Sequence, residues 1–477
     1  MPSPESTDSP PALRGCRWFV AAVVVLVLLD AAKHVLLWSI GLGQPWSDSV
    51  GYWRLGTDVA RGDIGMLQTA WGYRTPGYPW FLGGLIAALR ESRAFVAAIT
   101  VQHLAVLATD LLVGWWTLRL TRSKGAALAA GLAMVLSTAR PLYANWLLTE
   151  SLATFFLTLA AFLLWSTGQR GLGRLVAASA VAAVGILIRP SLVILAPLVV
   201  AIAIIDAWRI PLSFGRRMLR VALPTVILLG LLAPWCGRNA HLFGRWTLLT
   251  FTGRELWTAN FSPWPGANLA IPEDGPGEEL RRRVAGAPSI DLRHNASVGG
   301  ALIGSGLNDA EADRLMERTA WLAIRRDPGR SGLHVLARVV TFWYCKEYAP
   351  PPPLEAPVFR SLIPPEHPAV ERVAAKLLAV SPERTFLATW AWSGLTVIAV
   401  LIAIWSSLLR RAGLILGFLL AGTTLLTAIL EIPLYRYRLP LEPLTVVALA
   451  AVVWDRLFRG SPPSGTPVGQ DKSSPVQ

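Results

Sequence analysis

One acid and one arginine in a short polar stretch are the first residues whose types could do chemistry. The stretch, Gly41 to Pro79, directly follows a long apolar segment. Asp48 lies near the end of that segment, and Tyr52 follows at a depth where aromatic rings favour the membrane interface. Arg74 opens RTPGYP, whose prolines interrupt helical hydrogen bonding. A carboxylate that can accept a proton and a guanidinium that can bind an anion are therefore expected at one membrane surface.

Further ions are predicted on the same face of the membrane. Those at outward ends of apolar segments are Asp48, Arg74, Glu150, Arg189, Arg238, Arg436 and Arg438. Unpaired ions at this depth are costly, so they must pair with each other or bind an anionic ligand. Arginine forks match phosphate oxygens in bidentate geometry. A phosphate attached to a lipid at the outer interface fits both the residue type and its depth.

The chemistry of a lipid-linked phosphate assigns roles to these acids and arginines. A sugar carried on polyprenyl phosphate already has a good leaving group, so the enzyme must deprotonate an acceptor hydroxyl and stabilise the departing phosphate. We predict Asp48 as the general base, with Asp58 as the second candidate. The phosphate ligands are expected among Arg74, Arg436 and Arg438. Arg189 and Arg238 fit a structural role better, as anchors of helix ends.

The composition is that of a polytopic membrane protein. Of 477 residues, 53% are hydrophobic and only 16% are charged. A soluble domain this apolar would expose large apolar patches. The net charge of +14 comes from lysines and arginines in short loops between apolar segments, without a continuous basic stripe, which argues against nucleic acid as a partner.

The cysteines do not form a metal motif. Cys16, Cys236 and Cys345 lack the paired Cys/His spacing of a zinc site, so no structural metal is expected. Cys236 and Cys345 are both predicted to face outward, and a disulfide between them stays open.

Ten apolar segments are candidate membrane spans. They are 18–40, 95–118, 126–139, 152–165, 175–188, 191–208, 221–235, 386–408, 414–432 and 439–454. Every short loop assigned to the cytoplasm carries at least two basic residues, which predicts a multi-pass protein of the cell inner membrane with both termini in the cytoplasm. The predicted fold class is all-α.

The other segments divide the chain into modules. Short interfacial helices are predicted from Ser47 and over Gly77–Leu89, and amphipathic helices over 309–324 and 332–344. In order, the modules are a disordered cytoplasmic tail (1–17), a membrane module (18–235) with the outer loop 41–79, an extracytoplasmic domain of mixed structure (236–385), a second membrane module (386–459) and a second disordered cytoplasmic tail (460–477).

Six motifs resemble one glycosyltransferase superfamily. In chain order they are SDSVGYWRLGTDVARGD, YRTPGYP, TESL, IRPSL, PWCGRNAHLFG and RYRLPLEP. Together they resemble the GT-C glycosyltransferases, in the branch of the protein O-mannosyltransferases and the lipid A aminoarabinose transferase (glycosyltransferase family 39-like). The resemblance covers most of the membrane part, whereas 261–382 matches nothing recognisable. It implies a GT-C-like fold and a polyprenyl-phosphate sugar as donor.

The resemblance also implies roles for single residues. Asp48 takes the position of the first-loop catalytic aspartate. The predicted donor and substrate-binding residues are Arg74, Tyr52, Glu150, Arg436, Tyr437 and Arg438. Relatives often carry an acid where this chain has Tyr73 and a second acid where it has Ser49. The sugar and any need for a divalent metal therefore stay open, and no other cofactor is expected.

The predicted function is transfer of a hexose or pentose, with inversion, from a polyprenyl-phosphate donor to a hydroxyl of a lipid, protein or cell-wall glycan on the extracytoplasmic face. One alternative is a transporter or flippase for lipid-linked solutes. Transporters place binding groups near the membrane midplane between repeated halves, whereas here the ions collect at one face without evident duplication. Another alternative is a glycan ligase or polymerase, which would also use outward arginines. An essential Asp48 favours monomer transfer.

Overall fold

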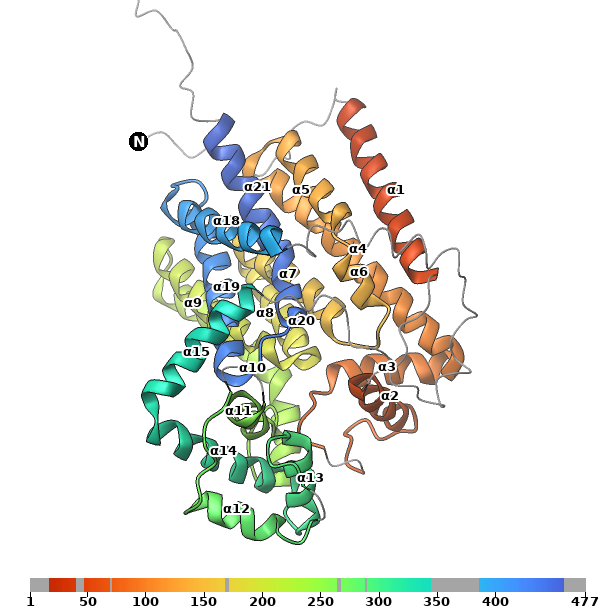
Figure 1. Cartoon of the computed structure of the whole chain (residues 1–477). Coiled ribbons are helices and arrows are strands. Elements are labelled where there is room, and N and C mark those ends of the chain that lie inside the picture. The colour runs from red at the N-terminus through yellow and green to blue at the C-terminus, as the bar shows by residue number, and fades with distance from the viewer. Residues whose placement is uncertain are drawn as a thin grey trace, which may run out of the picture.

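Helices make up all the regular structure that is described. The computed structural model describes residues 17–39, 47–68, 71–167, 171–263, 267–287, 290–344 and 386–458. The elements in these ranges are α1 (Arg17–Ser39), α2 (Ser47–Ala60), α3 (Gly77–Leu89), α4 (Glu91–Thr121), α5 (Lys124–Leu136), α6 (Ala139–Ala144), α7 (Glu150–Trp165), α8 (Leu172–Ile188), η1 (Pro190–Ile194), α9 (Leu195–Arg209), α10 (Phe214–Phe243), α11 (Thr252–Phe261), α12 (Pro276–Val284), α13 (Asn295–Gly304), α14 (Asp309–Arg326), α15 (Pro328–Trp343), α18 (Phe386–Trp405), α19 (Arg410–Leu430), α20 (Tyr435–Arg438), η3 (Leu439–Leu441) and α21 (Glu442–Phe458) (Figure 1). Nearly all of both predicted tails lies outside these ranges. Cys345 does too, and with it the open question of a disulfide to Cys236.

Length and apolar composition make many of these helices membrane spans. In the described part of the chain, six helical segments qualify by themselves: Arg17–Trp38, Glu91–Thr121, Pro190–Arg209, Phe214–Phe243, Arg410–Leu430 and Tyr435–Leu457. Shorter apolar helices accompany them, namely α3, α5, α7, α8 and most of α18. The chain is therefore a multi-pass membrane protein. Each of the ten predicted spans corresponds to a helix, while the number that cross completely stays a prediction.

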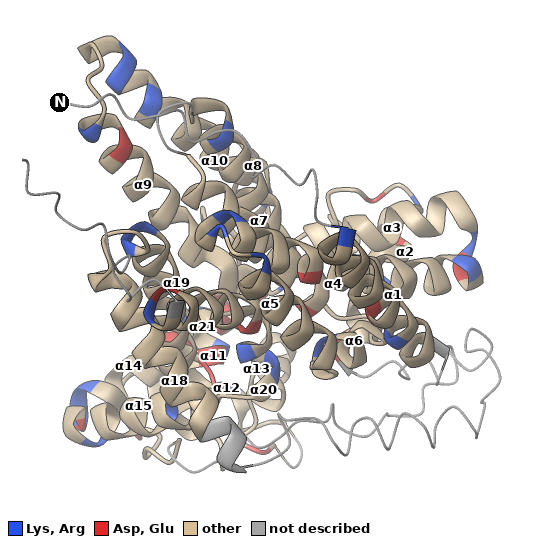
Figure 2. Ribbon diagram, turned by 90° about the horizontal axis from the view of Figure 1, so that it is seen from above, with Lys and Arg blue, Asp and Glu red and all other residues tan. Residues whose placement is uncertain are grey.

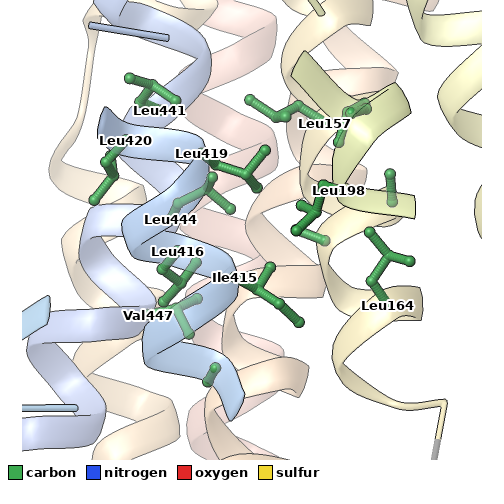
Figure 3. Packing of buried hydrophobic residues seen from close by; sticks show 14 of the residues in the cluster. Leu157, Leu164, Leu198, Ile415, Leu416, Leu419, Leu420, Leu441, Leu444 and Val447 are labelled. Carbon is green, nitrogen blue, oxygen red and sulfur yellow. The ribbon is translucent and has the colours of Figure 1, made fainter. Parts of the chain in front are cut away.

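Aliphatic side chains from distant segments fill the centre of the bundle (Figure 3). Leu157 of α7, Leu198 of α9 and Leu419 of α19 are buried in one cluster. Because lipid is as apolar as these side chains, close packing rather than removal from water holds such helices together. Figure 2 shows charged residues sparsely distributed along the ribbons of the bundle.

Buried ions fasten α1 to its neighbours. Lys33 pairs with Asp30 one turn earlier at 2.7 Å, and its ammonium donates to the carbonyls of Met134 and Ser137 at the end of α5. The carbonyl end of a helix attracts a cation, so this lysine links two helices inside the bundle. A second buried ion pair, between Arg140 of α6 and Asp110 of α4, joins two neighbouring helices of the bundle.

In its described residues, the predicted outer domain (236–385) is helical, where we expected mixed structure. These residues contain the end of α10, the helices α11 to α15 and connecting segments. Frequent glycine and proline in a polar stretch suggested mixed structure, but the described helices bury one face together, with Trp257 and Met316 in the buried cluster. The two predicted amphipathic helices are present as α14 and α15. Leu333, Leu336 and Val340 of α15 are exposed, as expected for a helix at a bilayer surface.

The two predicted interfacial helices, α2 and α3, pack side by side next to the bundle (Figure 1). Two glycines let their backbones approach. A Cβ built on Gly83 would lie 2.5 Å from the Val59 side chain, and one on Gly56 would lie 2.8 Å from Leu82. This close contact fixes the start of α2 relative to the segment that leads into α3, and so fixes Asp48 relative to Arg74.

Candidate active site

Asp48 lies between two arginines from distant parts of the chain. Arg74 Nη2 donates to Asp48 Oδ1 at 2.6 Å, and Arg436 Nη1 donates to Asp48 Oδ2 at 2.9 Å. The side chains are 25% exposed for Asp48, 22% for Arg74 and 17% for Arg436. The predicted acid and two of the predicted phosphate ligands thus form one cluster that is partly open to its surroundings.

Aromatic residues orient both guanidinium groups. Arg74 lies 4.5 Å from the centre of the Tyr52 ring and donates to the Tyr52 hydroxyl at 3.1 Å. Arg436 Nη2 donates to the hydroxyl of Tyr437 at 3.2 Å. The rings supply cation–π attraction and restrict the rotamers of the arginines. Tyr52 is buried, so its place is behind Arg74 rather than at an open surface.

Electrostatics keep Asp48 ionised. Burial by itself would raise the pKa of this carboxyl. Arg74 and Arg436 act in the opposite sense, through their charges and hydrogen bonds, and together they hold the pKa of Asp48 well below its ordinary value. Asp48 also lies in the first turn of α2, where the helix dipole favours a negative charge. In this arrangement the carboxylate is a weak base.

A second ion pair lies beside the first. Glu150, the first residue of α7, pairs with Arg189 at 2.9 Å, and Arg189 Nη1 also donates to Thr149 at 2.8 Å. The Tyr437 ring is 5.6 Å from the Arg189 guanidinium and 5.1 Å from that of Arg436. The start of α7, the end of α8 and α20 therefore meet at one end of the bundle, as the predicted topology required.

Three predicted residues are not part of this cluster. Arg438 donates to the Trp343 carbonyl at 2.9 Å instead. Arg238 donates to the carbonyls of Gly65 and Trp71, both at 3.0 Å, and so holds the outer loop in place. Asp58 lies ten residues beyond Asp48 on α2, about 15 Å along a helix axis.

Two carboxyl groups that the sequence did not single out lie next to the cluster. Glu431, directly after α19, accepts from the Tyr437 hydroxyl at 3.1 Å. Glu255 lies against Glu431, because its helix, α11, packs on α19. Glu431 precedes the RYR motif by a few residues, which could have drawn notice to it. Glu255 lies in the outer domain, where no motif was recognised.

Asp48 is occupied as a metal ligand in this arrangement, because both of its oxygens accept from arginine. Among the described residues, one group with suitable ligand atoms is Asp30, His34 and Asp110, within the bundle. Lys33 and Arg140 already neutralise these two acids, so their charges oppose a bound cation there.

Comparisons with known proteins give distant structural likenesses. No family matches the sequence, and no characterised protein matches it either. Similar solved structures include apo ArnT from Cupriavidus metallidurans, with 16% identity over 91% of this chain and 78% of ArnT and a TM-score of 0.37. ArnT bound to undecaprenyl phosphate gives 15% identity, coverages of 92% and 78%, and a TM-score of 0.39.

A third similar structure is the archaeal oligosaccharyltransferase AglB from Archaeoglobus fulgidus, in complex with an inhibitory peptide and a dolichol-phosphate. Its identity is 14%, the match covers 93% of this chain and 51% of AglB, and the TM-score is 0.40. This chain thus spans about half the length of AglB.

Proposed function

We propose that the protein transfers a sugar from a polyprenyl phosphate to an acceptor hydroxyl on the outer face of the membrane. The observation that supports this function is that Asp48 pairs with both Arg74 and Arg436, an arrangement that we call the arginine clamp. It brings a candidate base and two candidate phosphate ligands into contact. The nearby pair of Glu150 and Arg189 offers further polar contacts for the donor. The cluster lies at one end of the bundle, where a lipid headgroup would be presented.

Donor binding exchanges one anion for another. The phosphate oxygens compete with Asp48 for the guanidinium forks of Arg74 and Arg436. As the two arginines turn toward the phosphate, their attraction for Asp48 weakens, and this attraction is what lowers the pKa of Asp48. Burial, which raises the pKa, then has the larger effect. The carboxylate therefore becomes a better base when the donor is in place.

The reaction then needs one displacement. Asp48 takes the proton of the acceptor hydroxyl, and the hydroxyl oxygen attacks the sugar carbon that carries the phosphate. Attack from the side opposite the phosphate inverts that carbon. Arg74 and Arg436 stabilise the charge that develops on the departing lipid phosphate, which is the largest contribution expected from fixed cations at such a site.

Asp48→Asn tests the role of the acid. Asparagine keeps the size of the side chain but cannot accept the proton, so we expect transfer to fall by about 10²- to 10⁴-fold, the usual contribution of a general base. The measurement is the release of label from radiolabelled polyprenyl-phosphate sugars by the full chain in lipid vesicles. Asp58→Asn is the matched control, because it makes the same change on the same helix away from the cluster.

Two results would contradict the proposal at different levels. If Asp48→Asn transfers sugar as fast as the native protein, Asp48 is not the base. If the native protein releases no label from any polyprenyl-phosphate sugar, with each candidate acceptor class supplied, the donor class is wrong, and a transporter or glycan ligase becomes the better reading.

A further inference from the structure

Two carboxyl groups lie against each other next to the arginine clamp, where α11 packs on α19. Glu255 comes from α11 of the outer domain, and Glu431 follows the end of α19 in the membrane part. Both side chains are partly buried. Two ionised carboxylates in contact only repel each other, whereas one shared proton lets one carboxyl group donate to the other. The contact itself therefore defines a proton-carrying pair.

A single hydroxyl connects the pair to the clamp. Tyr437 donates to Glu431 Oε2 at 3.1 Å and accepts from Arg436 Nη2 at 3.2 Å. Arg436 is one of the two arginines that hold Asp48. The charged and titratable groups that act on the pair are Arg74, Arg436 and Tyr437. A phosphate on Arg436 would therefore lie close to the pair.

The two acidic centres are perturbed in opposite directions. Burial, followed by the charge and hydrogen bond of Glu431, raises the pKa of Glu255 well above its ordinary value, and the two arginines only partly oppose this. The pKa of Asp48 is lowered. When environments separate the pKa values of nearby carboxyl groups, the raised group suits an acid and the lowered group suits a base.

We propose that the Glu255–Glu431 pair is the general acid of the reaction and protonates the departing phosphate, an inference that rests on the proposed function. The bond between the acceptor oxygen and the sugar carbon forms as the bond from that carbon to the phosphate oxygen breaks. The acceptor's proton goes to Asp48, and the pair's proton goes to the phosphate oxygen. The lipid phosphate then leaves as a monoanion, which the arginines release more readily than a dianion.

Glu255→Gln and Glu431→Gln test the acid. Glutamine keeps a hydrogen bond in the pair but supplies no acidic proton. We expect kcat to fall about 100-fold, the lower end of what general acid catalysis contributes, while the Kd for polyprenyl phosphate without sugar stays unchanged. Glu279→Gln on α12, which removes a partly exposed carboxylate from an i,i+4 pair with Arg283, is the matched control.

The pH profile separates an acid from a merely structural contact. An acid must be protonated to act, so native kcat/KM should fall as the pH rises through the raised pKa of Glu255, and the glutamine variants should lack this alkaline fall. A phosphorothioate donor, which releases a more acidic thiophosphate, should reduce both the alkaline fall of the native protein and the defect of the variants. The comparison of the two donors uses the native protein alone, so it does not depend on whether a variant folds.

Failure of this inference is distinct from failure of the proposed function. A native protein that transfers sugar without an alkaline fall, or whose alkaline fall is equal for the two donors, overturns the acid role while leaving the function intact. Glutamine variants with the native rate do the same. Absence of transfer by the native protein overturns the function itself.

Discussion

At the scale of single residues, the site depends on the shape of arginine rather than on positive charge alone. Arg436 uses one nitrogen for Asp48 and the other for the Tyr437 hydroxyl. A lysine ammonium is a compact charge on a flexible stem and cannot hold two partners in this fixed plane. The same argument applies to Arg74, which bridges Asp48 and Tyr52.

Arg436→Lys should therefore weaken donor use. Loss of one oriented, charge-assisted hydrogen bond to the phosphate predicts a rise of about 10- to 100-fold in KM for the donor. Arg438→Lys is the matched control, since Arg438 lies on the same short helix but donates to the Trp343 carbonyl. The KM of the Arg438 variant should stay near the native value. Equal increases for both variants would mean that the distinction between the two arginines is wrong.

The sequence could predict the charged residues that lie at helix ends, but not which of them point together. Asp48, Arg74 and Arg436 were placed on one face by the pattern of spans and basic loops, and they meet in the structure. Arg436 and Arg438 flank Tyr437, and only the rotation of α20 decides which one reaches Asp48. Glu255 could not be predicted, because its position depends on how the outer domain packs.

At the scale of elements, α3 carries Arg74 into place through a close contact with α8. A Cβ built on Gly77 would lie 2.7 Å from the carbonyl carbon of Leu187 and 2.8 Å from the nitrogen of Ile188. Glycine is required here by space rather than by its backbone angles. Because Arg189 follows directly after α8, the same contact also sets the distance between the two parts of the site.

Gly77→Ala should disturb both stability and activity. The added methyl group meets backbone atoms that cannot rotate away, so we expect a loss of about 1–3 kcal/mol in stability together with weaker donor binding. Gly84→Ala is the control on the same helix, where nothing lies within 4 Å of an added Cβ. That variant should be neutral or more stable by about 0.5–1 kcal/mol. Thermal unfolding and donor KM of both variants check this, and a fully native Gly77→Ala would contradict the tight contact.

Helix bounds were predictable because long apolar runs and basic loops leave few alternatives. The expected interfacial helix over Gly77–Leu89 has these bounds in the structure. In the outer domain, α14 and α15 were predicted, whereas α11 to α13 were not, since their short runs show no period long enough to distinguish a helix from a strand. The start of α14 carries a further signal, a capping box between Asn308 and Glu311.

At the scale of the whole molecule, the outer domain must be held firmly on the membrane bundle, because the site takes residues from both. Arg338 of α15 makes this connection. Its Nε donates to the Ala428 carbonyl near the end of α19, and its Nη1 donates to the Ala259 carbonyl of α11, both at 2.6 Å. A cation at the carbonyl end of a helix is also favoured by the helix dipole. Arg338 thereby sets α11, which carries Glu255, against α19, which precedes Glu431.

Arg338→Met should loosen this connection while keeping most of the apolar stem. Two buried carbonyls lose their donors, so we expect the protein to lose about 3 kcal/mol of stability. If the pair of Glu255 and Glu431 depends on the connection, the alkaline fall of kcat/KM should weaken in the same variant. Thermal unfolding in vesicles and the pH profile measure the two effects separately.

Arg330→Met provides the control on the same helix, because the Arg330 side chain is exposed and donates to the Asn268 side chain at 3.2 Å. Its removal should change stability by less than about 0.5 kcal/mol and leave the pH profile unaltered. If Arg338→Met unfolds at the native temperature and keeps the native pH profile, the outer domain is held by its apolar contacts alone, and the position of Glu255 does not depend on Arg338.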